Sequence, residues 1–474
     1  MFWSRNALIC AVFAAGLSAS PTFVNSIVLP GNSIDLHPGS GANLNRLGFF
    51  SDIYFNPASN LFYGLADRGA GGGTLSYNTR VEQFSLAVNP ATGAISNFNV
   101  TRTITFKDAN GNPFNGLNPL LLNGSSANLG RSFDPEGFVV APNGHFFVAD
   151  EYGPSLYEFN ANGTFVRAFE RPANLIPKDA NGINYTADRS SGLIDGRQDN
   201  RGYEGLAISP DGTKLYAVLQ DPLVNEGSQN DGRRSTNVRI VEFNTQTGQA
   251  TNQFIYQLES RSDINARVPG DTFGATNQGR NIGISALIAI DSTRFLVVER
   301  DNRGVGVDDP TGSRPIGSKR VYEINIGGAT DVSNISLSGL NNLPNGVIAV
   351  SKVLHLDIQA ALAALGLTIP EKIEGITVGP KLVNGDYLLL IGNDNDFSIT
   401  QNSSGVQFDV CSGGDQVAID TPCPAGQTLL PGYLFAFRDS ELQGYVSPAS
   451  VPEPSTFVVS AIGLIGLASL RRRA

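Results

Sequence analysis

The chain has 474 residues, with 33 lysines and arginines against 43 aspartates and glutamates and a net charge of −10 at neutral pH. This acidic balance argues against nucleic acid as a partner, because a phosphate backbone selects basic surfaces. Glycine and proline are plentiful, charged residues make up 16% of the chain, and short alternating stretches replace long helical patterns. These features predict an all-β fold.

Residues 1–19 are typical of a secretory signal peptide. Arg5 precedes an apolar run over 7–17, and small residues follow at 18–20, which is the order of a charged, an apolar and a cleavable segment. The alternative is a buried N-terminal strand. Export would place the mature domain, expected over 26–450, in an oxidising space.

Five hairpins recur along the mature chain, each made of two alternating apolar stretches around a short turn. They start roughly seventy to ninety residues apart and cover 49–69, 134–159, 203–222, 284–304 and 373–396. Further strand-like stretches follow most of them, which would complete four-stranded antiparallel sheets. Repeats of this size and content are the signature of a β-propeller.

The sequence allows five or six blades. The stretch 327–370 supplies either a sixth blade or an insertion, since its segment IQAALAALGL is typical of a helix. We expect strands from both ends of the domain, NSIVLP near the start and 433–439 near the end, to close the ring in one blade. A two-sheet sandwich is the rival architecture, but it would not explain hairpins repeated at this interval.

Acidic residues gather at one end of these hairpins. The first strand of a propeller blade lies nearest the axis, so its beginning and the end of the second strand point to the same mouth of the channel. We therefore expect a carboxylate-lined mouth. The predicted metal ligands there are Asp52, Asp67, Glu136, Asp150, Glu151, Glu204, Asp221, Glu299, Asp301, Glu374 and Asp394, with Asp396 beside them.

A bound divalent cation would relieve the repulsion among these acids, because like charges raise each other's pKa and destabilise a fold. All the ligands are oxygens, so Ca²⁺ fits best and Mg²⁺ second. Long polar loops on the same side, such as 221–236 and 299–319, also favour a functional face. Four arginines beside the acids either bind phosphate bidentately or only neutralise their neighbours. They are Arg68, Arg201, Arg300 and Arg303.

Cys411 and Cys423 are the cysteines that remain once Cys10 leaves with the signal peptide. In an exported chain this lone pair predicts a disulfide bond. The shortage of cysteine, together with only three histidines, argues against a zinc site of the usual kind.

Residues 451–474 combine Val-Pro-Glu-Pro, an apolar stretch over 457–470 and three arginines at 471–473. The apolar stretch is short for a membrane span, and the arginines would hold it on the cytoplasmic side. This segment resembles the PEP-CTERM sorting signal. The resemblance implies an exosortase-type processing enzyme, a transient membrane anchor, and attachment at the cell surface or release from it.

Glu-Gly pairs open three of the first strands, and the motifs DPEGF at 134–138, DEYGP at 150–154 and NRGYEG at 200–205 accompany them. Together these resemble the phytase-like family described as having esterase-like activity, over roughly residues 44–440. The resemblance implies calcium-dependent hydrolysis of phosphate mono- or diesters, with a phosphorylated small molecule as substrate. We predict Glu136, Glu204 and Glu374 as the catalytic residues.

Two other functions remain open. A calcium-stabilised adhesive propeller would use the same acids for structure and its long loops to hold a surface glycan or a protein. A sugar-lactonase-like propeller would need fewer metal ligands. A serine nucleophile is disfavoured because no Gly-x-Ser-x-Gly elbow is present, and His145 lies within an apolar strand where packing explains it.

Overall fold

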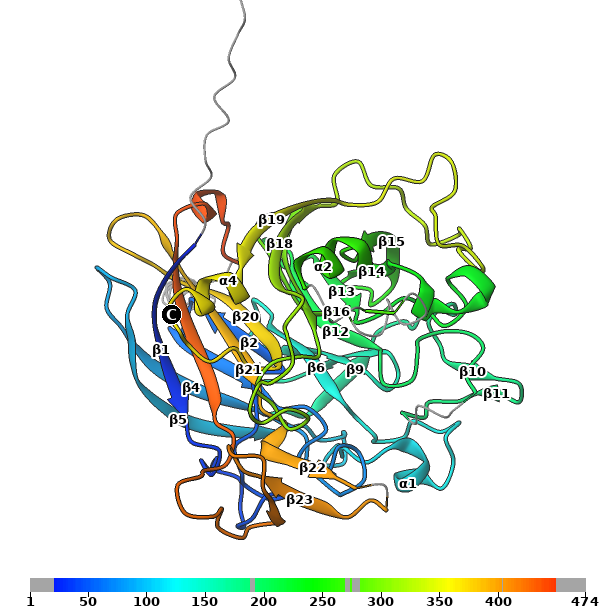
Figure 1. The fold of residues 1–474 in the computed structure, drawn as a ribbon. Coiled ribbons are helices and arrows are strands. Elements are labelled where there is room, and N and C mark those ends of the chain that lie inside the picture. The colour runs from blue at the N-terminus through cyan, green and yellow to red at the C-terminus, as the bar shows by residue number, and fades with distance from the viewer. Residues whose placement is uncertain (1–20, 188–191, 269–272, 275–281, 403, 449–474) are drawn as a thin grey trace, which may run out of the picture.

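The structure is a computed structural model and describes residues 21–187, 192–268, 273–274, 282–402 and 404–448 (Figure 1). The predicted signal peptide and the sorting segment lie outside these ranges. Within them, no helix has the length and apolar character that crossing a membrane requires.

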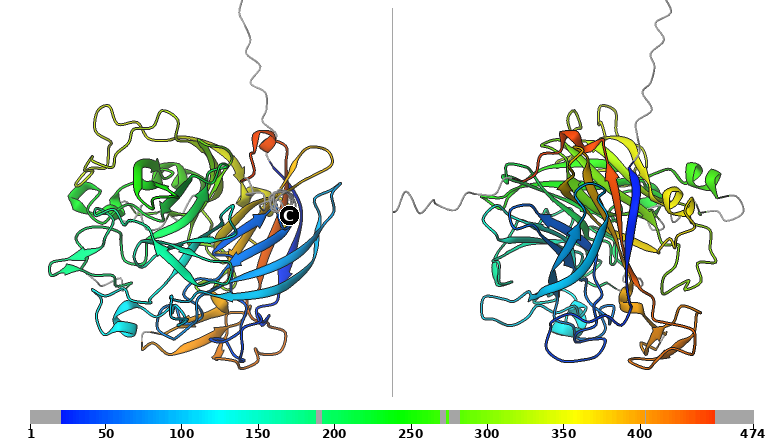
Figure 2. Two further views of the ribbon diagram at one scale, coloured as in Figure 1. Left: turned by 180° about the vertical axis from the view of Figure 1, so that it is seen from behind. Right: turned by 90° about the vertical axis from the view of Figure 1, so that its left-hand side faces the viewer.

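Five four-stranded antiparallel sheets make up most of the described chain (Figures 1 and 2). The first contains β2 (Asp52–Asn56), β3 (Leu61–Leu65), β4 (Arg80–Val88) and β5 (Ile95–Thr105). The second contains β6 (Pro135–Val140), β7 (Phe146–Asp150), β8 (Ser155–Phe159) and β9 (Phe165–Ala168). The third contains β12 (Tyr203–Ile208), β13 (Lys214–Leu219), β14 (Asn237–Asn244) and β15 (Ala250–Gln257).

The fourth sheet contains β16 (Ile282–Ala289), β17 (Arg294–Asp301), β18 (Lys319–Asn325) and β19 (Ser351–Asp357). The fifth contains β20 (Lys372–Lys381), β21 (Tyr387–Asp394), β25 (Gly432–Asp439) and β1 (Thr22–Leu29). Each of the five predicted hairpins therefore forms the inner strand pair of one sheet.

The inner strands close a ring. Strand β2 packs against β6, β6 against β12, β12 against β16, β16 against β20, and β20 against β2. In the fifth sheet Ile27 of β1 pairs with Leu434 of β25, so strands from both ends of the domain close one blade as predicted. The predicted all-β propeller is confirmed, and the described residues form five blades.

The stretch 327–370 is an insertion and not a sixth blade. Its last strand, β19, is the outer strand of the fourth blade, and the predicted helix follows it as α4 (Ile358–Ala363). The loop before β19 bonds to the outer strand of the third blade, since the amides of Val332 and Val350 donate to carbonyls of β15.

Glycines let the inner strands approach one another closely. A Cβ atom on Gly205 would lie 2.7 Å from the backbone nitrogen of Leu287 in the next blade, and one on Gly137 would lie 2.9 Å from that of Leu206. A side chain there would push the blades apart. This close approach explains why each predicted Glu-Gly pair has glycine as its second residue.

Smaller elements occupy the connections. They are α1 (Pro119–Asn123), α2 (Arg261–Arg267), β10 (Lys178–Asp179), β11 (Gly182–Ile183), and 3₁₀ turns at Ser228–Asn230, Gly232–Arg234, Asp396–Ser398 and Leu442–Gly444. Between β21 and β25 the chain forms a three-stranded sheet of β22 (Ile399–Gln401), β23 (Gln407–Val410) and β24 (Gln416–Ala418). We call residues 399–430 the flap.

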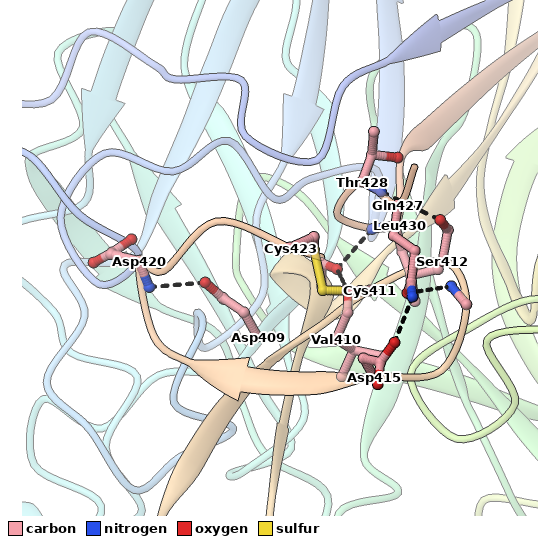
Figure 3. The surroundings of a disulfide bond; sticks show 12 residues. Asp409, Val410, Cys411, Ser412, Asp415, Asp420, Cys423, Gln427, Thr428 and Leu430 are labelled. Atoms are coloured by element: carbon pink, nitrogen blue, oxygen red, sulfur yellow. Dashed lines mark hydrogen bonds between the residues drawn. A yellow bond between two sulfur atoms is a disulfide. The ribbon is translucent and has the colours of Figure 1, made fainter. Parts of the chain in front are cut away.

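The flap is braced by the predicted disulfide between Cys411 and Cys423, which the structure confirms (Figure 3). Asp409 of the flap accepts a hydrogen bond from the amide of Asp420 at 2.8 Å. Both of these carboxylates form ion pairs with Arg46, which is buried in the loop before the first blade. The flap is thereby fastened to the body of the propeller.

Replacing Cys411 and Cys423 by serine is expected to lower the free energy of unfolding by roughly 2–3 kcal/mol, because a short closed loop is freed in the unfolded chain. Denaturant unfolding of the exported protein, compared with wild type, measures the difference. An unchanged unfolding midpoint would contradict the expectation.

Candidate active site

Four inner strands begin with a β-bulge. The register shifts between Pro135 and Gly137, between Tyr203 and Gly205, between Ile284 and Ala286, and between Ile373 and Gly375. The extra residues are Glu136, Glu204, Ser285 and Glu374. A bulge removes its extra residue from the ladder and redirects the side chain, which turns the three glutamates into a single cavity.

This cavity has a volume of about 300 Å³ and lies at the mouth of the channel where the inner strands begin. The flap contributes Thr400, Gln401 and Gln407 to its wall. Its acidic lining residues are Asp67, Glu136, Glu151, Glu204, Asp308, Glu371, Glu374 and Asp396, and its basic ones are Arg68, Arg201, Arg300 and Lys372. Acids therefore outnumber bases two to one.

Burial and mutual repulsion favour the protonated form of these acids. Burial foremost, and then the nearby carboxylates of Glu204 and Asp134, raise the pKa of Glu136 well above its usual value. Burial and the charge of Asp134 raise the pKa of Asp67 to about 7. Burial likewise raises the pKa of Asp134 to about 7, against the opposing effect of Arg68. Such clusters of shifted carboxyls are typical of functional sites.

Several buried carboxylate oxygens have no hydrogen-bond partner among the described residues. Those of residues that line the cavity are Oε1 of Glu151, Oε2 of Glu204 and Oε2 of Glu371. Glu136 is 8% exposed, and no described side chain forms an ion pair or hydrogen bond with its carboxylate. Unpaired buried acceptors are rare in folded proteins and indicate an absent ligand or a functional role.

Two triads of carboxylates share one residue. Oxygens of Asp67, Asp134 and Glu136 all lie within 4.8 Å of one another, and so do oxygens of Asp67, Asp394 and Asp396. Two oxygens that each contact one Ca²⁺ at about 2.3–2.6 Å lie at most about 5 Å apart, so each triad has the size of a cation site. Asp134 and Asp396 were absent from the predicted ligands, although Asp134 stands only two residues before a bulged glutamate.

Asp396 owes its position to an unusual turn. Asp396, Phe397 and Ser398 have φ angles of 49°, 55° and 58°, a left-handed conformation that costs roughly 1–2 kcal/mol per residue. Phe397 is buried against Gly48, where a Cβ atom would lie 2.4 Å from its ring. Packing of this ring holds the strained turn and with it the acid at the cavity.

Three of the predicted ligands lie outside the cavity because local donors hold them. Asp52 accepts hydrogen bonds from the amides of Ile53 and Phe138, both at 2.8 Å. Asp150 accepts from the amides of Asp134 at 2.8 Å and Gly153 at 2.7 Å. Asp221 forms an ion pair with Arg201 at 2.9 Å.

Two predicted ligands in the fourth blade also form hydrogen bonds and ion pairs away from the cavity. Glu299 accepts from the hydroxyl of Tyr256 at 2.6 Å and pairs with Lys352 at 2.6 Å. Asp301 pairs with Lys319 at 2.9 Å. The structure does not bring these two, or Asp52, Asp150 and Asp221, to the cavity wall, and their role as ligands stays a prediction.

Three of the four predicted arginines line the cavity, and the fourth does not. Arg68 lines the cavity and pairs with Asp134 at 3.1 Å, and Arg201 lines it beside Asp221. Arg303 lies away from it, stacked over Phe273 with 4.0 Å between guanidinium and ring centre.

Arg300 lies in the fourth blade, whose bulge holds Ser285 in place of a glutamate. It donates to the Ser285 hydroxyl at 3.1 Å and pairs with Glu374, while its distance to Glu204 is 3.9 Å. These contacts make Arg300 an internal counterion for two of the three glutamates. Lys372, which the sequence reasoning missed, pairs with Asp396 at 2.5 Å and Asp394 at 3.5 Å.

The backbone is similar to several solved structures. They include hydrazine synthase of Kuenenia stuttgartiensis (12% identity, 73% of this chain and 77% of that chain, TM-score 0.29). A luciferin-regenerating enzyme (11%, 90% and 99%, TM-score 0.29) and the Dos1 propeller (10%, 81% and 67%, TM-score 0.26) are also similar. Likeness at this level carries no functional argument.

An uncharacterised secreted protein of Arthroderma benhamiae is 27% identical over 328 residues, which are 58% of this chain and 62% of that protein. The chain thus spans less than two thirds of this relative. Residues 450–473 match the PEP-CTERM protein-sorting motif, which implies exosortase processing, and the protein is exported and sorted to the cell surface. Residues 45–397 match the family described as having the esterase-like activity of phytase, and the chain belongs to this phytase-like family.

Proposed function

We propose that the protein is an exported hydrolase of phosphate esters that works with divalent cations held in the acidic cavity. The observation that carries the proposal is the buried triad of Asp67, Asp134 and Glu136, in which Glu136 has no basic partner among the described residues. The esterase-like description of the family supports phosphate esters as the substrate class.

The donor set fits a hard cation. Every candidate ligand is a carboxylate oxygen, which Ca²⁺ and Mg²⁺ both accept, and the larger Ca²⁺ tolerates the irregular arrangement better. Asp67, Asp134 and Glu136 would hold the first ion. A bound cation would neutralise the charge of a phosphate ester and promote ionisation of a water molecule.

The protein's own groups account for binding and proton transfer. Arg68, Arg201 and Lys372 line the cavity and come from the first, third and fifth blades. Their positive charges would orient the phosphate. Glu204 offers Oε2, which has no hydrogen-bond partner among the described residues, as the proton acceptor for the attacking water. Glu374, held by Arg300, would position that guanidinium beside Glu204.

At its C-terminus we propose that the sorting segment anchors the protein to the membrane transiently, before an exosortase cuts it. The apolar stretch over 457–470 and the three arginines after it support this role.

The exported protein is expected to release phosphate from phytate or an aryl phosphomonoester, or an aryl alcohol from a phosphodiester, in the presence of calcium. A chelator should abolish turnover because the acidic cavity would repel the substrate once its cations are removed. Added Ca²⁺ should restore turnover, and Mg²⁺ is the comparison ion.

Absence of turnover on both ester classes, in either ion, would contradict the proposal. It would favour the calcium-stabilised surface-binding propeller instead. Hydrolysis of a sugar lactone without hydrolysis of phosphate esters would favour the lactonase-like alternative.

A further inference from the structure

We infer that the cavity binds two divalent cations that share Asp67, and that the ammonium group of Lys372 competes with the second of them. The inference deepens the proposed function at the same site. Cation binding can be measured without turnover, so the two can fail separately.

Shared ligation follows from the two triads. Asp67 belongs to both, with Asp134 and Glu136 on one side and with Asp394 and Asp396 on the other. It follows strand β3 of the first blade and is 8% exposed, and its Oδ1 accepts from the amide of Gly69 at 2.7 Å. The carboxylate is thus fixed between an acid pair from the second blade and one from the fifth.

When all of its acids are ionised, the cavity carries more negative charge than one divalent ion balances. Its acidic lining residues exceed the basic ones by four, eight against four. Asp134 and Asp394 add further negative charge to the two triads. One divalent cation would leave at least two negative charges unbalanced in a buried site, whereas two cations balance the lining.

Next to each triad lies a further glutamate, outside the triad, with a carboxylate oxygen that has no hydrogen-bond partner among the described residues. Glu204, whose Oε2 has no hydrogen-bond partner, is the strongest charged neighbour of Glu136. Glu371, whose Oε2 also has none, has Asp396 as its strongest charged neighbour and is 7% exposed. Each triad therefore has a buried acceptor next to it that would accept a hydrogen bond from a water molecule on the cation.

The two triads define two subsites. The first consists of Asp67, Asp134 and Glu136, and the second of Asp67, Asp394 and Asp396. They have different basic neighbours. In the second, the Lys372 ammonium lies 2.5 Å from Asp396 and 3.5 Å from Asp394, so it already neutralises two of the three ligands. In the first, Arg68 contacts Asp134 at 3.1 Å, and no basic side chain in the described part of the chain pairs with Glu136. The second cation must displace the lysine, and its subsite is therefore the weaker one.

Calorimetric titration of the chelator-stripped exported protein with CaCl₂ is expected to show two bound ions per chain with different affinities. Glu136→Gln should remove the tighter site and Asp396→Asn the weaker one, while Asp67→Asn should weaken both. Lys372→Met should tighten the weaker site by about tenfold or more, because a competing charge is removed at close range. Glu323→Gln, on the outer surface of β18, is the matched control.

Different results would overturn the inference. A single bound ion, or one site lost equally in Glu136→Gln and Asp396→Asn, would exclude two subsites. An Asp67→Asn effect confined to one site would exclude sharing, and an unchanged or weaker second site in Lys372→Met would exclude competition. If Asp67→Asn does not fold, the wild-type stoichiometry and the other three site variants still decide between one and two subsites. Two bound ions without phosphate release would contradict only the proposed function.

Discussion

In calcium-free buffer the protein is expected to lose thermal stability as the pH rises from about 4 to about 8. Burial foremost raises the pKa of Asp67 and of Asp134 to about 7 in the folded state, whereas unfolded aspartates titrate near about 3.9. Between these values the folded protein holds protons that the unfolded chain has released. Stability therefore decreases with pH across this window.

This fall of stability with rising pH is opposite to the effect of a carboxylate in a salt bridge, whose pKa is lowered on folding. Below about pH 4 the two carboxyls are protonated in the folded and the unfolded protein, and their protonation contributes its full stabilisation. Above about pH 7 they are ionised in both, and this stabilisation is lost. The loss follows the ionisation of these two neighbouring carboxyls in the folded state. Melting temperatures across the pH series measure it.

Calcium is expected to reverse this loss at pH 8 and to have little effect at pH 5. A cation binds ionised carboxylates and not protonated ones, so it takes the place of the protons that leave. At a free concentration about a hundredfold above its dissociation constant, one ion adds about 2.7 kcal/mol. Equal calcium effects at both pH values, or a flat profile without calcium, would contradict this account.

Asp134→Asn is the matched variant for the same experiment. It removes one titrating group and its repulsion on Asp67, so its calcium-free profile should be flatter than that of wild type. Glu323→Gln, in a half-buried pair with Arg294 away from the cavity, should keep the wild-type profile.

Much of the fold could be predicted because its signals are local. Alternation of apolar residues around short turns marks each inner hairpin, and the interval between hairpins marks the repeat. The closing blade could be predicted from strand-like stretches at both ends. The stretch 327–370 was ambiguous because its outer strand follows a long loop, and a lone strand does not reveal which sheet it joins.

The site could be predicted less completely. The three glutamates followed by glycine were found because the bulge and the close approach of blades both leave a mark in the sequence. Ser285 occupies the same structural position without that mark. Asp396 was expected beside the ligands at the mouth, but the left-handed turn that makes it part of a triad leaves no mark in the repeat. Lys372, at a strand start, was not predicted.

Acids at the ends of second strands show why a residue's place in the repeat does not suffice to predict a metal ligand. Glu299 and Asp150 stand at equivalent strand ends, but loop amides of Glu259 and Asp134 take up one oxygen of each. The hydroxyl of Tyr256 on β15 takes up the other oxygen of Glu299. Whether an acid faces the cavity or a local donor depends on loop conformations that lie outside the repeat.

Replacing Glu204 by glutamine is expected to reduce the proposed turnover at least about tenfold, or roughly 1.4 kcal/mol in activation free energy. Glutamine keeps the size of the side chain and an Oε1 that accepts from Gln220. It removes the acceptor at Oε2, which has no partner in the described structure. Because Glu204 belongs to neither carboxylate triad, calcium binding should persist.

The separation of turnover from cation binding makes this variant informative. Neutralising a buried acid that other carboxylates repel should also leave the calcium-free fold at least as stable as wild type at pH 8. A loss of activity would then come from proton transfer and not from unfolding. Full activity in Glu204→Gln would assign the proton acceptor elsewhere, with Glu136 the next residue to replace, whereas loss of both calcium and turnover would make Glu204 a ligand.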